Sequence, residues 1–349
     1  MRAFTSLSRG NYLLTRDICI TVDVEDFFLP RPCFDTVFAR QGGQDWGIGR
    51  IMQALDQYGA RGTFYVDVYN RTTLTEALLE DACTRVVRGG HELGLHTHPE
   101  FPKGVRGYGM QQVMSSYPFQ RQLELVGQGC DWIRRWTGQG PKTHRAGGYG
   151  ANMDTLAALA ACDITSDSSL YAGYPYCELA RQAHAVNTCF VQSGVREVPV
   201  TTTRNCFGLP LPGGGWLGPQ LEMKIDLDWL DLQGLQQQVD AALAETDAPV
   251  VIFLHSYSLL DLNKGMRPDT CTLLKLQALL HWLARRGDVV LSTVPEAAAR
   301  ASVHVLPSGC LPECRFNLAT QPVRWARYAS KAISVDRVRK LLLPRKQTP

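Results

Sequence analysis

Short β-branched runs alternate with segments of helical periodicity along most of the chain. Eight such runs are candidate strands, and many of them are separated by amphipathic stretches. This alternation predicts an α/β fold with a parallel, barrel-like sheet. The predicted strands cover residues 18–24, 61–68, 91–96, 142–146, 163–167, 196–202, 249–256 and 288–294, and the predicted helices cover residues 49–58, 75–87, 110–136, 154–161 and 270–286.

Two regions depart from the alternation. Residues 171–225 are rich in Tyr, Pro and Gly, so we expect long loops there, at one rim of the barrel. From about residue 303 the periodic pattern fades. We therefore predict a flexible N-terminal leader over residues 1–16, a single barrel domain over residues 17–302, and a C-terminal extension over residues 303–349.

The end of that extension, residues 324–346, is basic with apolar residues interleaved. One interpretation of this basic tail is a solvated terminal helix. The other is a weak contact with an anionic membrane surface or with a partner. The sequence leaves both open.

Composition limits the classes of protein that the chain can belong to. Hydrophobic residues make up 45 % and charged residues 20 %, as in an ordinary globular protein. A formal net charge of +3 is too small to indicate a nucleic-acid partner. The 11 cysteines are scattered, as is typical of reduced thiols. Because the N-terminus lacks the apolar segment of a secretory signal, we expect a cytoplasmic protein.

Three carboxylates lie close together where the first predicted strand ends. The segment CITVDVEDFF, residues 19–28, carries Asp23, Glu25 and Asp26. Mutual repulsion and lost hydration make such a group unfavourable unless a cation or hydrogen-bond donors compensate. In a parallel α/β barrel, chemistry is found at this carboxyl end of the strands. A divalent cation would neutralise one or two of the acids and leave another free to react.

Two histidines follow a later predicted strand. In the segment GGHELGLHTHPE, His96 and His98 occupy alternate positions and Glu100 lies two positions further on. Imidazole with carboxylate suits Zn, Co, Fe or Ni. Two histidines and one carboxylate leave coordination positions open, as a catalytic metal site requires. The pattern predicts one divalent metal ion, and zinc is the first expectation.

Further polar side chains lie at other predicted strand ends. Arg145 precedes a glycine-rich turn in HRAGGYG, where backbone N–H groups can face an anion. His255 ends the run VVIFLH, and Asp167 ends DITSD. A histidine with an aspartate to orient it is the arrangement of a general acid. Taken singly, these residues would be explained as well by a helix cap, a half-buried histidine and an Asx turn.

Taken in order, these segments resemble the five motifs of the polysaccharide deacetylase superfamily, carbohydrate esterase family 4. The segments are TVDVEDFF, GHELGLHTHPE, HRAGGYG, DSS and FLHS, and RGTFYV is similar to the family's second strand. The resemblance spans residues 17 to about 300. It implies a distorted (β/α)7-type barrel that holds one divalent metal ion and removes N-acetyl groups from amino sugars.

The resemblance also implies a base and a ligand set. Asp23 falls on the family's base, and His96 falls on its first metal-binding histidine. One further ligand comes from the acidic segment and one from the second motif, and the sequence leaves both choices open. The candidates are Glu25 or Asp26 in the first case and His98 or Glu100 in the second.

The remaining roles fall on the later motifs. Arg145 would pair with the base and orient it, and a backbone N–H of Gly148 or Tyr149 would help to hold the oxyanion. His255 would protonate the leaving amine and would be oriented by Asp167.

The aromatic residues of the predicted rim, Tyr171, Tyr174, Tyr176 and Trp216, suit stacking on sugar rings. We expect a deacetylase that acts on a nucleotide- or lipid-linked amino sugar inside the cell. Two other functions stay open. One is hydrolysis of a non-peptide C–N bond in a cyclic amide or ureide on the same fold. The other is a barrel that binds glycan without catalysis.

Overall fold

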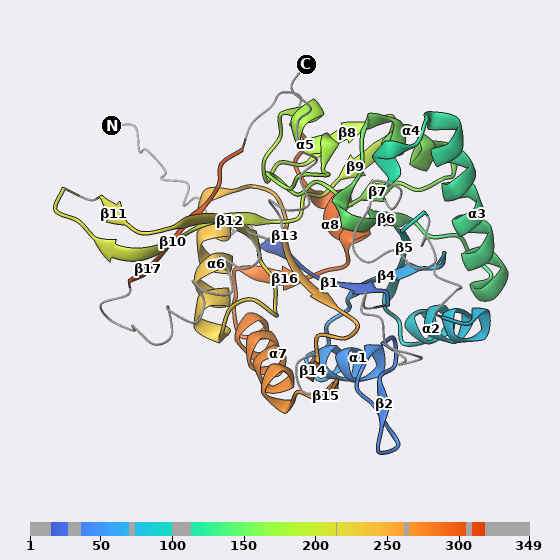
Figure 1. Ribbon diagram of the computed structural model, residues 1–349, viewed down its shortest axis with the longest axis horizontal. Helices are drawn as coiled ribbons and strands as arrows, with labels where there is room; N and C mark the ends of the chain where they lie inside the picture. Colours follow the sequence, from blue (N-terminus) through green and yellow to red (C-terminus); the bar gives the residue numbers. More distant parts are fainter. Residues whose placement is uncertain are drawn as a thin grey trace, which may run out of the picture.

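A nine-stranded, mostly parallel sheet forms the centre of the computed structural model, which describes residues 15–26, 36–69, 74–99, 113–213, 215–261, 265–304 and 309–317 (Figure 1). Its strand order is β13-β1-β4-β5-β6-β7-β9-β8, with β16 also paired to β1. Within this sheet β8 is antiparallel to β9. The strands are β1 (Arg16–Val24), β4 (Thr63–Asp67), β5 (Glu92–Thr97), β6 (Thr143–Ala146), β7 (Ser166–Asp167), β8 (Phe190–Gln192), β9 (Val195–Glu197), β13 (Val250–His255) and β16 (Val289–Leu291).

Helices lie around this curled sheet and bury an apolar face against it (Figure 1). In α2, Thr75 caps the first turn, and Leu79, Ala82, Cys83 and Val86 are buried at the spacing of one helical face. The architecture is therefore the predicted α/β barrel type, in a distorted and open form. The helices are α1 (Ile48–Asp56), α2 (Glu76–Arg88), α3 (Phe119–Thr137), α4 (Met153–Ala161), α5 (Glu178–Ala183), α6 (Leu232–Glu245), α7 (Thr270–Ala284) and α8 (Val294–Arg300), with short 3-10 helices η2 (Met114–Ser116) and η3 (Gly147–Tyr149).

The prediction of long loops over residues 171–225 is wrong. This region contributes α5, β8 and β9, and then forms a second sheet of β10 (Thr202–Pro210), β11 (Trp216–Leu217) and β12 (Gln220–Lys224). From the predicted C-terminal extension, β17 (Glu313–Asn317) adds to it parallel to β10. The glycines and prolines that suggested loops stand near the turn between β10 and β11. We call β10, β11, β12 and β17 the arm, because Figure 1 shows them projecting from the barrel.

Strand register brings distant polar residues to one edge of the main sheet. Asp23 at the end of β1 is paired with His255 at the end of β13. His96 on β5 is paired with Arg145 on β6. Because these strands are parallel, their carboxyl ends lie at the same edge. The fold therefore gathers the predicted site residues from segments that are far apart in sequence.

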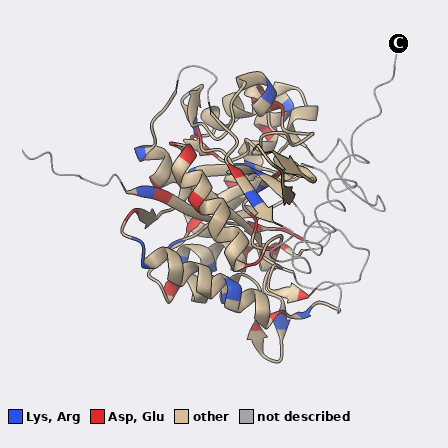
Figure 2. Ribbon diagram, turned by 90° about the vertical axis from the view of Figure 1, so that its left-hand side faces the viewer, with Lys and Arg blue, Asp and Glu red and all other residues tan. Residues whose placement is uncertain are grey.

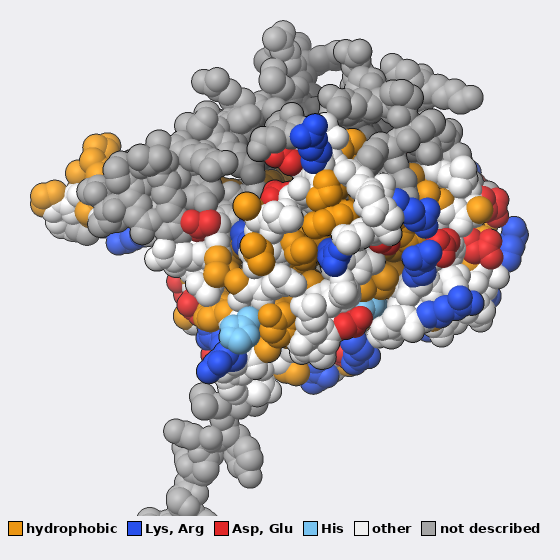
Figure 3. Space-filling view, turned by 90° about the horizontal axis from the view of Figure 1, so that it is seen from below, with side chains coloured by type: hydrophobic (Ala, Val, Ile, Leu, Met, Phe, Trp, Pro, Cys, Tyr) orange, Lys and Arg blue, Asp and Glu red, His pale blue; other side chains and the backbone are white. Residues whose placement is uncertain are grey.

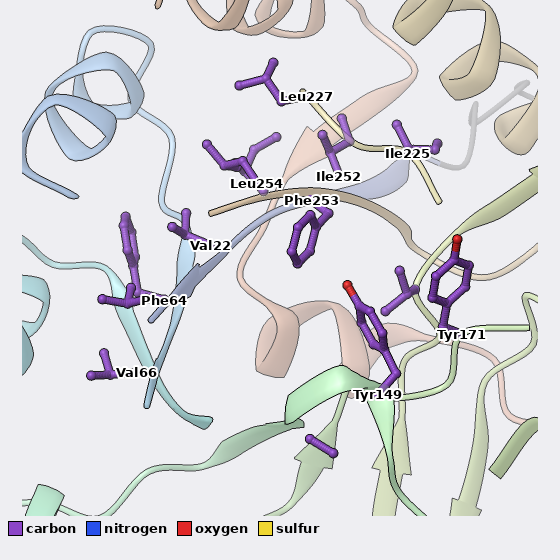
Figure 4. Packing of buried hydrophobic residues seen from close by; sticks show 14 of the residues in the cluster. Val22, Phe64, Val66, Tyr149, Tyr171, Ile225, Leu227, Ile252, Phe253 and Leu254 are labelled. Atoms are coloured by element: carbon purple, nitrogen blue, oxygen red, sulfur yellow. The ribbon is translucent and has the colours of Figure 1, made fainter. Parts of the chain in front are cut away.

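The sheet rests on a continuous buried core. Val22, Phe64 and Leu254 come from the three adjacent strands β1, β4 and β13, and all have no exposed surface. Figure 4 shows the ring of Phe253 reaching toward Tyr149 beside this cluster. A strand buried on both faces must be apolar along its length, which explains the unbroken run of β13.

The surface carries charges of both signs. Figure 2 shows Lys and Arg interspersed with Asp and Glu over the ribbon. Cysteines in the described ranges are free thiols, and most are buried. No helix in the described part of the chain combines the length and the apolar character needed to cross a bilayer. The basic tail and Cys33 lie outside the described residues.

Candidate metal centre and active site

Glu25, His96 and His98 form a buried group at the carboxyl edge of the sheet. The ligating atoms of the three residues all lie within 4.8 Å of one another. Oε2 of Glu25 lies 3.1 Å from Nε2 of His96 and 2.8 Å from Nε2 of His98. Two imidazoles and one carboxylate directed at one point make a suitable donor set for a divalent transition metal.

The hydrogen bonding of His96 supports a cation at this point. Its Nδ1 lies 2.8 Å from the carbonyl oxygen of Arg145, which can only accept, so Nδ1 carries the hydrogen. A neutral His96 then has a lone pair on Nε2, facing the carboxylate of Glu25. Two electron-pair donors facing each other need a positive charge between them, either a proton or a metal ion. The residues therefore fit a divalent metal, and the bond to Arg145 fixes the ring as ligating histidines require.

Electrostatics around Glu25 point the same way. Burial raises the pKa of this carboxyl, but His98 and His96 outweigh that effect and hold the pKa well below its usual range. Glu25 is therefore a carboxylate, ready to act as a ligand.

The other candidate ligands occupy different places. Asp26 is half-buried and accepts a hydrogen bond from the hydroxyl of Thr36 at 3.1 Å. Both acids follow the end of β1 at Val24, and Glu25 reaches the two histidines while Asp26 bonds Thr36. Glu100 lies outside the described residues.

Asp67 is a buried acid close to the group, and the sequence analysis did not predict it. It lies at the end of β4, paired in register with His96. Burial raises the pKa of its carboxyl to about 7. Its Oδ1 accepts the backbone N–H of Tyr69 at 3.1 Å.

Asp23 is held by Arg145 from across the barrel. Nη1 of Arg145 donates to Oδ1 of Asp23 at 2.9 Å and to the hydroxyl of Thr21 at 3.0 Å. Nε and Nη2 of the same guanidinium donate to the backbone and hydroxyl oxygens of Ser168. Arg145 has no exposed surface and remains charged, because Asp23 offsets the cost of its burial. The other oxygen of Asp23 lies 3.7 Å from Nε2 of His96, so this carboxylate borders the group of Glu25, His96 and His98.

His255 closes the site from the side of β13. Its Nε2 lies 3.5 Å from Oε1 of Glu25, and its Nδ1 lies 3.9 Å from Oδ2 of Asp228. The hydroxyl of Ser258 donates to that same oxygen of Asp228 at 2.8 Å. Burial lowers the pKa of His255, but Asp228 and Glu25 more than offset this and raise the pKa. The ring of Tyr257 stacks on the imidazole at 4.6 Å.

The prediction that Asp167 orients His255 is therefore wrong, and Asp228 occupies that position. Strand order gives the reason, because β7 lies on the far side of β6 from β13. Asp167 pairs with His144 of β6 instead, with Oδ1 2.6 Å from Nδ1, and both side chains are fully buried. The other ring nitrogen of His144 lies 3.0 Å from the hydroxyl of Thr97. This pair links β5, β6 and β7 beneath the site.

The turn of η3 lies directly against His98 of the group of Glu25, His96 and His98. A Cβ built on Gly147 would lie 2.5 Å from ring atoms of His98, so only glycine fits there. Gly148 and Tyr149 follow, both with φ of 55°. The two predicted oxyanion donors therefore stand on a tight turn beside His98.

Trp216 lies away from this group. It belongs to β11 on the arm, where it pairs with Pro210 and where Arg315 lies over its ring at 5.9 Å. Figure 3 shows hydrophobic side chains at the outer end of the arm, where Leu217 is 61 % exposed. The expected place of Trp216 beside the site is therefore wrong, because residues 202–224 form a projecting sheet rather than a rim.

The sequence analysis also missed Lys224, Asp226 and Asp228. They occur in the segment KIDLDW, residues 224–229, where charged and apolar residues alternate. Alternation with buried neighbours marks one polar face directed at the interior, and this signal was available in the sequence.

Comparison with known proteins gives likenesses in structure only. No protein-family model and no curated protein matches the chain. One solved structure, described as "putative polysaccharide deacetylase from Mycobacterium smegmatis", matches with a TM-score of 0.52 and 17 % identity over 89 % of this chain and 99 % of that chain.

Two more structures match with lower scores. A family 4 carbohydrate esterase from Streptomyces lividans, in complex with acetate, has a TM-score of 0.42 and 13 % identity over 84 % of this chain and 98 % of that chain. Peptidoglycan deacetylase PdaC from Bacillus subtilis has a TM-score of 0.41 and 14 % identity over 82 % and 92 %. The likeness to the Mycobacterium smegmatis structure concerns the fold alone. It agrees with the distorted (β/α)-barrel fold that the resemblance to carbohydrate esterase family 4 implies.

Proposed function

We propose that the protein is a metal-dependent hydrolase that removes N-acetyl groups from an amino sugar or a glycan precursor. The observation that carries this proposal is the group of Glu25, His96 and His98, buried at the carboxyl edge of the sheet. A carboxylate held by a guanidinium borders this group on one side, and a histidine with a carboxylate 3.9 Å from its Nδ1 borders it on the other. Hydrolysis of an amide needs such a base and such an acid.

Glu25, His96 and His98 would hold the metal ion, and zinc fits this donor set. When bound, a divalent ion supplies Lewis-acid chemistry that polarises a carbonyl and acidifies water. His96 is already oriented for this task by its bond to the carbonyl of Arg145.

Asp23 would take the proton of the attacking water. Its Oδ1 is engaged by Arg145, so its Oδ2, on the side of His96, is the oxygen available for that proton. Arg145 holds the carboxylate of Asp23 in place, because its four donated hydrogen bonds fix the guanidinium.

The turn and His255 would act on the other end of the amide. A backbone N–H of Gly148 or Tyr149 would donate to the developing oxyanion, for which one good donor contributes about 3 kcal/mol. His255 would give its proton to the departing amine, because C–N cleavage releases a poor leaving group otherwise. Asp228 and Glu25 favour the protonated form of His255 that this step requires.

We further propose that the substrate is a nucleotide- or lipid-linked amino sugar and that the enzyme works in the cytoplasm. The cysteines, which are scattered along the sequence and free in the described residues, support this location. Of the aromatic residues that suit sugar stacking, Trp216 lies on the arm, whereas Tyr171 and Tyr174 lie against Tyr149 of η3. Contact of the basic tail with a membrane surface stays a proposal, since the whole of that tail lies outside the described residues.

Acetate release tests the proposed function. Protein loaded with zinc or cobalt is incubated with acetylated amino-sugar donors, and in parallel with a ureide and a cyclic imide. We expect acetate from the sugars, no turnover by Asp23→Asn, and unchanged turnover by Asp131→Asn, an exposed change on α3. Turnover of the ureide or imide alone would assign the fold to another C–N hydrolase. Tight glycan binding without any turnover would assign it to a binding protein.

A further inference from the structure

Lys224 is a buried lysine beside the site that no step of the proposed reaction uses. Its side chain is 6 % exposed, and its Nζ lies 3.3 Å from Oδ2 of Asp226. The same Nζ donates to the hydroxyl of Tyr149 at 2.7 Å. A buried ammonium needs a countercharge, and Asp226 supplies it. The bond to Tyr149 is not required for neutralisation and calls for a separate explanation.

Tyr149 adopts a backbone conformation that side chains rarely take. Gly148 and Tyr149 both have φ of 55°, and the N–H of Gly150 donates to the carbonyl of Gly147 at 3.2 Å. Two consecutive left-handed residues closed by such a bond are typical of a type I′ turn, which favours Gly, Asn and Asp. A tyrosine at the second position is sterically disfavoured, so its surroundings must hold it there.

Those surroundings are an aromatic group to which Lys224 is bonded twice. The ring of Tyr149 meets those of Tyr171 and Tyr174 edge-on, at 5.1 Å and 5.4 Å. The side chain of Lys224 bonds the hydroxyl of Tyr149, and its backbone N–H donates to the hydroxyl of Tyr171 at 3.2 Å. Figure 4 shows the hydroxyls of Tyr149 and Tyr171 directed away from the η3 ribbon, with the ring of Phe253 beside Tyr149.

Contacts between aromatic rings would not by themselves fix the position of the phenol oxygen of Tyr149. Aromatic contacts are broad in distance and angle, whereas a hydrogen bond to the phenol oxygen is directional. Lys224 is itself fixed, because its Nζ also lies against the ring of Phe253 and pairs with Asp226. The ammonium therefore defines where the end of Tyr149 lies, and through it the backbone of the turn.

The position of this turn matters because the turn is part of the site. Gly147 packs on the ring of His98, and the next two residues carry the proposed oxyanion donors. We infer that Lys224 is a positioning residue that fixes the left-handed turn of Gly148 and Tyr149 through the phenol oxygen of Tyr149. This inference rests on the proposed function for its effect on rate, but the fixed turn itself is independent of any substrate.

Three variants test the rate effect: Lys224→Met, Tyr149→Phe and the double variant. Removing a whole oxyanion donor costs about 10²- to 10³-fold in kcat, so displacing one should cost roughly tenfold. We expect each single variant to lose roughly that factor with KM unchanged. The double variant should lose no more than Lys224→Met, since that change already breaks the contact that Tyr149→Phe removes. Wild-type kcat in Tyr149→Phe, or losses that multiply in the double variant, would contradict the inference. Lys142→Met and Tyr58→Phe, on other parts of the fold, are the matched controls.

Amide hydrogen exchange tests the turn without any substrate. The N–H of Gly150 and that of Ala151 are both bonded within the turn, to the carbonyls of Gly147 and Tyr149. We expect these two amides to exchange faster in Lys224→Met and in Tyr149→Phe than in the wild type and the controls. Faster exchange in a protein that releases no acetate would reject the proposed function and keep the positioning role. Unchanged exchange would overturn the positioning role whatever the activity.

Discussion

The carboxylate of Asp228 lies 3.9 Å from Nδ1 of His255, on the opposite side of the ring from Glu25. In the proposed reaction this arrangement orients the histidine that protonates the leaving amine. We predict that Asp228→Asn lowers kcat by about 10²-fold or more with little change in KM, because general acid catalysis contributes about 10²- to 10⁴-fold. Steady-state acetate release measures both constants.

Asp167→Asn is the informative comparison, because the sequence pattern alone assigned the orienting role to Asp167. Its carboxylate is fully buried against His144, so the change should lower the melting temperature. The protein that remains folded should keep most of its kcat. The assignment of Asp228 would be wrong if Asp167→Asn had a lower kcat at unchanged stability while Asp228→Asn kept the kcat of the wild type.

Gly147 gives a steric test of the metal centre. In Gly147→Ala the new methyl group would lie 2.5 Å from the ring of His98, so the ring has to move. We predict a loss of metal affinity of about 10- to 100-fold, the range seen when the support of a ligand is disturbed. Competition with a chromophoric chelator measures it.

Gly127→Ala in α3 is the matched control for that substitution. Its new methyl group would meet only Cys162 Sγ at 3.9 Å, an ordinary contact. Alanine also favours the helix by up to about 1 kcal/mol. This variant should keep its metal affinity and unfold at a higher temperature. Equal metal affinity in the two variants would show that Gly147 does not pack on a ligand.

Glu92 predicts how stability depends on pH at the end of the barrel away from the site. Burial, with a smaller effect of Glu296, raises the pKa of its carboxyl from 4.5 to about 7. Between pH 4.5 and about 7 the folded protein binds more protons at Glu92 than the unfolded chain does. The contribution of Glu92 to the free energy of unfolding therefore falls as pH rises.

Glu92→Gln removes this titration. Relative to wild type, its free energy of unfolding should be little changed below about pH 4.5 and should rise through the window to pH 7. Above about pH 7 the difference should level off, with the variant about 1 to 3 kcal/mol more stable than the wild type. Urea unfolding at several pH values measures the difference. A difference independent of pH would contradict the raised pKa.

Much of the fold could be predicted because buried parallel strands and amphipathic helices leave strong patterns. The apolar run of β13 and the spaced apolar residues of α2 are examples. The helix α6 was missed because its buried face includes Gly234 and Gln238 among apolar residues. Gln238 is buried and donates a hydrogen bond to the hydroxyl of Thr203, on the arm, at 2.8 Å. Such a tertiary contact leaves no local pattern in the sequence.

The candidate site could be predicted only where one strand carries its residues. Strand alternation places Asp23 and Glu25 on the same face, and it places His96 with His98. The partner of His255 could not be found in this way, because Asp228 comes from a different segment and is brought near by the pairing of Asp226 with Phe253. Such a contact depends on the order of strands in the sheet, which the chain's local patterns do not encode.

Cobalt binding tests the central claim most directly, because visible absorption of bound Co²⁺ reports its ligands. We predict that the wild type binds about one equivalent in a site with nitrogen and oxygen ligands. Glu25→Gln should weaken binding by more than about 100-fold, since outer-shell changes alone cost about 10- to 100-fold. Asp26→Asn, the neighbouring acid bonded to Thr36, should bind as the wild type does. No bound cobalt in the wild type, or loss of binding in Asp26→Asn with retention in Glu25→Gln, would contradict the account.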